Sequence, residues 1–163
     1  MVKKKSFGIT IKKWLDEEFP KTILTSDDQF EFSIEIENAV VKGLNIVISQ
    51  PKEKNVVGIV CQLRLPKDVT NIVKEFTDEQ KVKLTQSLHR ELLKMIQDHT
   101  VDKNLDFVLI TERVYFDNLN RQKLMDGITK IRNVMLYLIS LIRDKFGGFD
   151  TPPPSTPDNS MYG

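Results

Sequence analysis

A continuous apolar stripe towards the C-terminal end of the chain is typical of one long helix packed on a core. Six apolar residues follow one another at intervals of four, three, four, three and four positions: Leu124, Ile128, Ile131, Met135, Leu138 and Ile142. These intervals keep the side chains on one face of an α-helix, because each residue advances by about 100° around the axis. Asn120 can cap the start of this helix, and Gly147 with Gly148 can end it in a left-handed conformation.

The residues before this helix alternate between apolar and polar side chains, which predicts strands. The alternation is clearest in residues 30–36, FEFSIEI, and it recurs in residues 44–48 and 56–65. The short connections between these three segments favour an antiparallel meander. Residues 106–116, DFVLITERVYF, predict one long strand or two short strands broken near Thr111.

Two further segments have helical patterns. Residues 10–19, TIKKWLDEEF, place their large apolar side chains at helical spacing, and Pro20 stops the pattern. A second pattern over residues 78–98 predicts a long helix, and Thr77 with Gln80 has the spacing of a capping box in front of it.

The order of these elements predicts the fold class. The order α-β-β-β-α-β(β)-α favours an α+β two-layer sandwich, with an antiparallel sheet and the helices mainly on one face. The 163 residues predict one domain, which we place at residues 1–148. Residues 149–163 contain four prolines and few apolar side chains, so we expect a disordered tail.

Charge and residue content argue against several classes of function. The chain has 24 basic and 23 acidic side chains and a formal net charge of +1, which argues against a nucleic-acid partner. Cys61 is the single cysteine, so neither a disulfide within the chain nor a multi-thiolate metal site can form. The glycines have no phosphate-loop or dinucleotide spacing. Because no apolar run approaches the roughly 20 residues that span a bilayer, we expect a cytoplasmic protein without a membrane segment.

The residues that could carry chemistry each have a simpler explanation. His89 and His99 lie ten positions apart along the predicted helix of about residues 78–98, with His99 at its C-terminal margin. They would be roughly 80° apart around the helix axis and about 15 Å apart along it. That geometry predicts that they cannot hold one metal ion together. Cys61 falls on the inward face of its strand and is expected in the core. Turn formation explains Asp117. The sequence therefore points to no catalytic, cofactor-binding or metal-binding residue.

One half of the C-terminal helix is apolar around most of its circumference. Val134, Tyr137 and Leu141 project to one side of the main stripe. Such a helix has to be covered on more than one side. One alternative is that the first helix or the N-terminal arm covers this flank, and the other is that a second protein chain does so. The flank at Val134, Tyr137 and Leu141 is therefore our candidate protein interface.

Three segments carry a recognisable family pattern: IKKWLDEE at residues 11–18, ISQPK at 48–52, and RVYFDNLNRQKLMDGITKIRNVMLYLISLIRDKFG at 113–147. They resemble a family of small, mostly archaeal proteins known only as a domain of unknown function. That family carries no established activity, so the resemblance implies no residue role. Its element order is similar to that of the type III secretion chaperones, small α+β dimers that hold extended segments of other proteins. This likeness implies protein binding only at the level of the fold.

Two hypotheses about function follow. The leading one is a non-enzymatic protein-binding module, chaperone-like or adaptor-like, that acts as a homodimer through apolar helix surface and an open sheet edge. The alternative is a small-ligand-binding protein or enzyme with a site near Arg113, Tyr115 and Asp117. A deep pocket with converging polar groups would favour this alternative. We expect no cofactor under the leading hypothesis.

Overall fold

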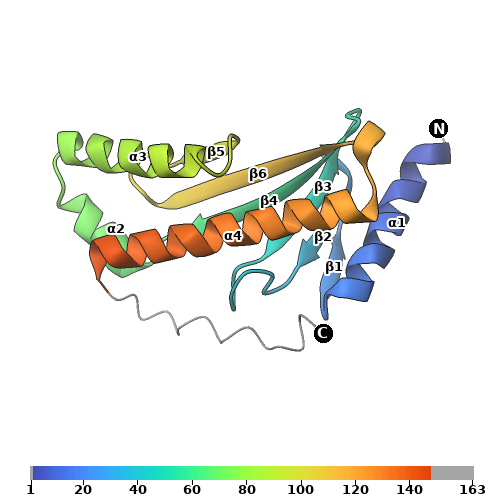
Figure 1. The fold of residues 1–163 in the computed structure, drawn as a ribbon, viewed down its shortest axis with the longest axis horizontal. Coiled ribbons are helices and arrows are strands. Elements are labelled where there is room, and N and C mark those ends of the chain that lie inside the picture. Colours follow the sequence, from blue (N-terminus) through green and yellow to red (C-terminus); the bar gives the residue numbers. More distant parts are fainter. Residues whose placement is uncertain (1, 148–163) are drawn as a thin grey trace.

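The computed structural model describes the backbone of residues 2–147 and the side chains of residues 7–147. These residues form four helices and six strands, with one 3-10 turn before the last helix (Figure 1). The helices are α1 (Val2–Glu18), α2 (Lys67–Lys74), α3 (Asp78–Leu93) and α4 (Arg121–Phe146), and the 3-10 turn is η1 (Phe116–Asn118). The strands are β1 (Thr22–Thr25), β2 (Phe30–Ile36), β3 (Ile46–Pro51), β4 (Val56–Arg64), β5 (His99–Val101) and β6 (Phe107–Tyr115). The predicted tail lies outside the described residues, and the domain boundary at residue 148 stays a prediction.

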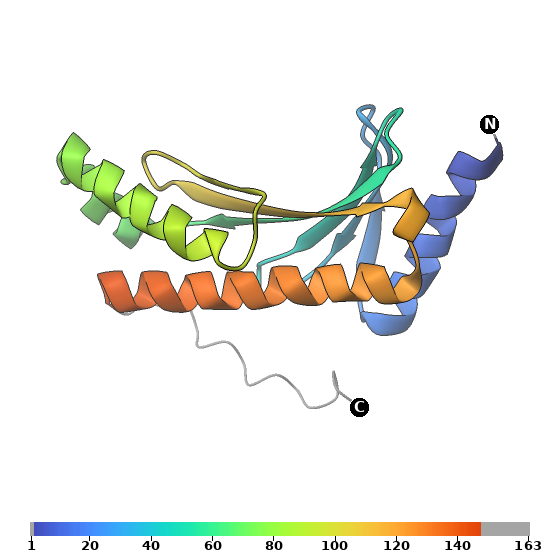
Figure 2. The ribbon, with the colours of Figure 1, turned by 45° about the horizontal axis from the view of Figure 1, so that its top comes forward.

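The six strands form one antiparallel sheet in the order β1-β2-β3-β4-β6-β5. Ile34, Ile48 and Ile59 stand side by side across β2, β3 and β4, and all three are buried. The long helix α4 runs along this apolar face, while α1 lies at one end of the molecule and α3 at the other (Figure 2). The predicted α+β class and element order are confirmed. The structure adds β1, α2 and β5, which have only four, eight and three residues.

The C-terminal helix follows its predicted pattern. All six residues of the apolar stripe are buried. The side chain of Asn120 caps the helix, because its Oδ1 accepts a hydrogen bond from the backbone N–H of Lys123 at 2.9 Å. Gly147 follows the last turn with a φ of 72°, the left-handed region that glycine adopts without steric cost.

The third helix is shorter than predicted. The capping box of Thr77 and Gln80 is present, but α3 ends at Leu93 and not near residue 98. The chain then turns so that His99 can pair with Ile110 in the sheet. Strand pairing with β6 outweighs the local helical pattern here, because helix propensity is a weak preference that tertiary contacts override.

Cys61 lies in the core, as its inward strand position predicts. Only 1% of the residue is exposed, and its Sγ donates a hydrogen bond to the backbone oxygen of Asn45 at 3.3 Å. Burial raises the pKa of the thiol to about 12. The thiolate is the reactive form, so we expect almost no labelling of native Cys61 by iodoacetamide near neutral pH and complete labelling in denaturant. Comparable labelling of the folded and unfolded protein would contradict this burial.

Candidate functional site

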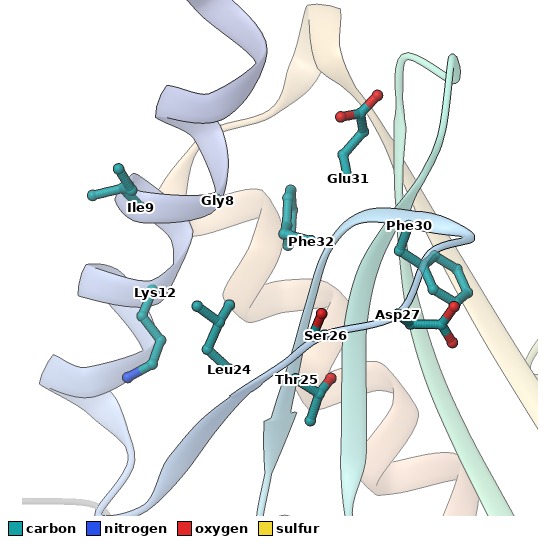
Figure 3. Close-up of a pocket in the computed structure, with 10 residues that line it drawn as sticks. All are labelled: Gly8, Ile9, Lys12, Leu24, Thr25, Ser26, Asp27, Phe30, Glu31 and Phe32. Atoms are coloured by element: carbon teal, nitrogen blue, oxygen red, sulfur yellow. The ribbon is translucent and has the colours of Figure 1, made fainter.

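An apolar hollow lies between α1 and the β1–β2 hairpin (Figure 3). Its volume is about 520 Å³, and its apolar wall includes Ile9 on α1, Leu24 on β1, and Phe30 and Phe32 on β2. Ile9 is 74% exposed and Leu24 is 62% exposed, the two highest values among the exposed large apolar residues that the structure describes. Both therefore expose apolar surface at the same hollow.

The sequence of α1 explains how the helix reaches the sheet and still leaves this surface open. Ile11 and Leu15 are fully buried and hold the helix on the core. Gly8 faces Phe32 so closely that a Cβ atom would lie 3.1 Å from the phenyl ring. Ile9 stands off the buried stripe, because it is two positions from Ile11 and thus about 200° around the axis. Helical geometry therefore leaves Ile9 at the outer rim.

The positive charge of Lys12, which lines the hollow, is paired within α1. Lys12 Nζ lies 2.6 Å from Asp16 Oδ1, one turn further along the helix. The hydrogen bond from Lys12 lowers the pKa of Asp16, and a hydrogen bond from the Thr22 hydroxyl adds to this effect. Asp27 and Glu31 line the opposite side. These groups surround an apolar wall and form no convergent acid–base set, so the hollow suits binding of apolar side chains.

The alternative site near β6 is only partly assembled. Arg113 and Tyr115 line a second hollow of about 400 Å³ beside α4, but Asp117 is not among its lining residues. Arg113 forms an ion pair with Asp98 at 2.8 Å and Tyr115 is mostly exposed. Asp117 lies in the exposed turn η1. The structure therefore brings two of the three predicted residues together.

Three of the charged residues that line this second hollow are held in ion pairs. Lys130 of α4 forms an ion pair with Glu112 at 2.9 Å, next to the pair between Arg113 and Asp98. Paired charges of this kind at a partly exposed surface contribute little net attraction for a charged ligand. The hollow therefore has polar walls in which Glu112, Arg113 and Lys130 are already held in ion pairs.

The three residues of the predicted interface on α4 differ in how far the rest of the chain buries them. Val134 is only 1% exposed, whereas Leu141 is partly buried and Tyr137 is 39% exposed. The Tyr137 hydroxyl donates a hydrogen bond to Glu91 Oε2 on α3 at 2.8 Å. This hydrogen bond raises the pKa of Tyr137. The helix α3 thus approaches the flank, a cover that neither sequence alternative included, and an interface at Tyr137 and Leu141 stays a prediction.

The two histidines lie together, contrary to the prediction from helical spacing. Because α3 ends before His99, the chain turns back and places His99 Nε2 2.7 Å from His89 Nδ1. His99 Nδ1 also lies 3.1 Å from the backbone oxygen of Ile96, which can only accept, so this nitrogen carries the proton. The facing nitrogens are thus engaged with each other. Within residues 2–147, no group of three or more His, Cys, Asp and Glu side chains could hold a metal ion.

The histidine pair predicts a loss of stability in mild acid. Burial lowers the pKa of His99 below its usual 6.5, and the positive charge of His89 acts in the same direction against the Ile96 hydrogen bond and Asp98. The folded state then binds the proton less tightly than the unfolded chain. The stability that the neutral His99 ring contributes is therefore present above pH 6.5. It is lost as the pH falls from 6.5 through the pKa of His99 in the folded state. We expect urea unfolding from about pH 7.5 to about pH 5.5 to show this loss.

A His99→Gln variant is the matched control for that measurement. Because glutamine does not titrate, the same pH range should lower the stability of this variant less than that of the wild type. Identical pH profiles for the two proteins would contradict a role for His99.

Comparison with known proteins identifies the family. The model of an uncharacterized conserved protein family, DUF2299, matches residues 9–142. The chain belongs to the DUF2299 family. This match confirms the resemblance seen in the sequence and includes Ile9 and Leu24 in the matched region. No curated protein sequence matches the chain.

Two solved structures resemble this DUF2299 chain. An uncharacterized protein from Methanothermobacter thermautotrophicus has a TM-score of 0.76 and 23% sequence identity, with 85% of this chain and 98% of that chain covered. At this identity the likeness shows a shared fold. YbjN from E. coli has a TM-score of 0.49 and 11% identity, with 82% of this chain and 91% of that chain covered. Among the described residues of the DUF2299 chain, no helix has the length and apolar character needed to cross a membrane.

Sequence reasoning missed Ile9 and Leu24 for two different reasons. Ile9 precedes the helical pattern that begins at residue 10, and its position off the buried stripe was the signal that could have identified it. Leu24 belongs to the four-residue strand β1, TILT, which is too short to show a period of two residues clearly. Only the folded chain brings the two side chains to one hollow.

Proposed function

We propose that this DUF2299 protein is a non-enzymatic protein-binding module whose binding surface is the hollow between α1 and the β1–β2 hairpin. The observation that carries the proposal is that Ile9 and Leu24, the two most exposed large apolar residues among the described side chains, lie at one hollow. Exposed apolar surface with a polar rim is typical of protein interfaces. The adjacent strand β1 also lies at the end of the sheet order, where an extended segment can add to the sheet.

A chaperone-like or adaptor-like role in the cytoplasm fits this surface. Such proteins recognise short segments by main-chain hydrogen bonds at a sheet edge and by pockets for apolar side chains. The ion pairs of Arg113 and Lys130 weaken the enzyme or ligand-binding alternative, because these charges are already engaged within the chain.

Photochemical crosslinking tests the proposal in the native host. Ile9 is replaced by the photoreactive residue p-benzoylphenylalanine, and Val82, an exposed apolar residue on α3, is replaced in a matched control. We expect a discrete protein adduct from position 9, its loss when Leu24→Lys is added, and no such adduct from position 82. Position 9 giving no protein adduct, or an adduct insensitive to Leu24→Lys, would remove this surface as the binding site.

A further inference from the structure

Within the described residues, strand β1 pairs with β2 on one side and leaves its other side open. The backbone N–H of Glu37 donates to the backbone oxygen of Lys21 at 3.2 Å, so the backbone groups of Lys21 point towards β2. In an antiparallel strand the backbone groups of successive residues point to opposite sides. The N–H and C=O groups of Thr22 and Leu24 therefore point away from β2, towards the open edge of the sheet.

The side chains of β1 decide which face of the sheet an added strand would share. Leu24 stands opposite Ile34 of β2, which is fully buried under the helices. The Leu24 side chain therefore lies on the same face as α1, beside the hollow that Ile9 also lines. A strand that pairs with β1 would place its own side chain over Leu24 on this face.

A second copy of the same strand is complementary to this edge. When two β1 strands run antiparallel about a twofold axis at Leu24, the outward backbone groups of Leu24 meet those of its twin, and Thr22 meets Ser26. The same register sets Lys21 opposite Asp27, which lies just beyond β1, at both ends of the pairing. Lys21 Nζ also lies 2.6 Å from Glu37 Oε2 of its own protomer, so each lysine would lie between two carboxylates. An axis at Ile23 would set Lys21 opposite Thr25, and an axis at Thr25 would set Ile23 opposite Asp27. Neither register places Lys21 opposite Asp27.

We propose that the partner at this hollow is a second copy of the chain, paired through β1 about a twofold axis at Leu24. This inference rests on the proposed function and names its partner. The two six-stranded sheets become continuous, and the Leu24 and Ile9 side chains of both protomers cover one another. Such an interface is isologous and closes as a dimer, because each copy presents the same patch to the other.

Cysteine crosslinking tests the register directly. A Leu24→Cys variant places two thiols on directly opposed residues, about 5.5 Å apart between Cα atoms, within the range that a disulfide bridges. We expect a disulfide-linked dimer under mild oxidation. Ile23→Cys is the matched control, because in this register its twin lies diagonally, about 7–8 Å away, and crosslinks poorly. The native thiol Cys61 is buried and contributes no background.

Light scattering tests the assembly without crosslinking. We expect the wild type to have about twice the 18.9 kDa chain mass. We expect Leu24→Lys to return to the monomer mass and to keep the circular dichroism spectrum of the folded chain, since Leu24 is an exposed side chain. A monomeric wild type, or a dimer that Leu24→Lys leaves intact, would overturn the proposal. A dimer dissociated by Tyr137→Glu with Leu141→Glu, and not by Leu24→Lys, would also overturn it and assign the α4 flank instead.

The two proposals fail in different ways. If position 9 crosslinks to a different protein while the purified chain is monomeric, the protein-binding function stands and self-pairing fails. If position 9 gives no protein adduct and the chain is monomeric, both fail.

Discussion

Replacing Ile131 with alanine is expected to lower the free energy of unfolding by about 3 kcal/mol. Ile131 is fully buried at the centre of the α4 stripe, and truncation there removes apolar contact and leaves a cavity. Leu136→Ala, five residues further along the same helix, is the matched control because Leu136 is 37% exposed. We expect this control to cost less than about 1 kcal/mol.

Equilibrium unfolding in urea measures the loss in free energy of unfolding for Ile131→Ala and for Leu136→Ala. Equal losses for the two variants would mean that the buried face of α4 is assigned incorrectly. If the Leu136 variant instead loses stability only at high protein concentration, the exposed side of α4 takes part in an assembly.

Gly127→Ala is expected to destabilise the protein by about 1 kcal/mol, although alanine is the better helix former. Gly127 lies where α4 crosses β4, and a Cβ atom there would sit only 2.4 Å from Ile59 Cδ1. Ile59 is fully buried, so its side chain has little room to move aside. The strain of overpacking, about 1 to 3 kcal/mol, therefore outweighs the gain in helix propensity of about 1 kcal/mol.

The double variant Gly127→Ala with Ile59→Val tests this explanation. Valine lacks the Cδ1 atom that the new methyl group meets, and Ile59→Val alone should cost about 1 kcal/mol. We expect the double variant to be more stable than the sum of the two single losses by at least about 1 kcal/mol. Additive losses would show that the close approach at Gly127 is not the cause.

The two predictions also show which parts of the fold were accessible to sequence reasoning. The α4 stripe and the alternation in β2 were predicted because burial on one face imposes a period on the sequence itself. Gly127 carried no such signal, since the reason for a glycine lies in the distance between α4 and Ile59 on β4. The adjacency of β4 and β6 was equally hidden, because strand pairing between distant segments leaves no local pattern.

The candidate site also has features that the sequence predicted and features that it did not. The sequence predicted an open sheet edge and apolar helix surface, but it placed the interface at Val134, Tyr137 and Leu141. In the structure Val134 is buried within the chain. The hollow at Ile9 and Leu24 was missed, because α1 and the β1–β2 hairpin meet there only after folding.

The sequence by itself determined the α+β class, the order of the main elements and the apolar faces of α4 and the strands, because each depends on periodicity within one segment. Only the tertiary structure decided where α3 ends, that His89 and His99 meet, and which apolar side chains remain exposed. These features depend on contacts between segments far apart in the chain, and the free energy of such contacts overrides local preference.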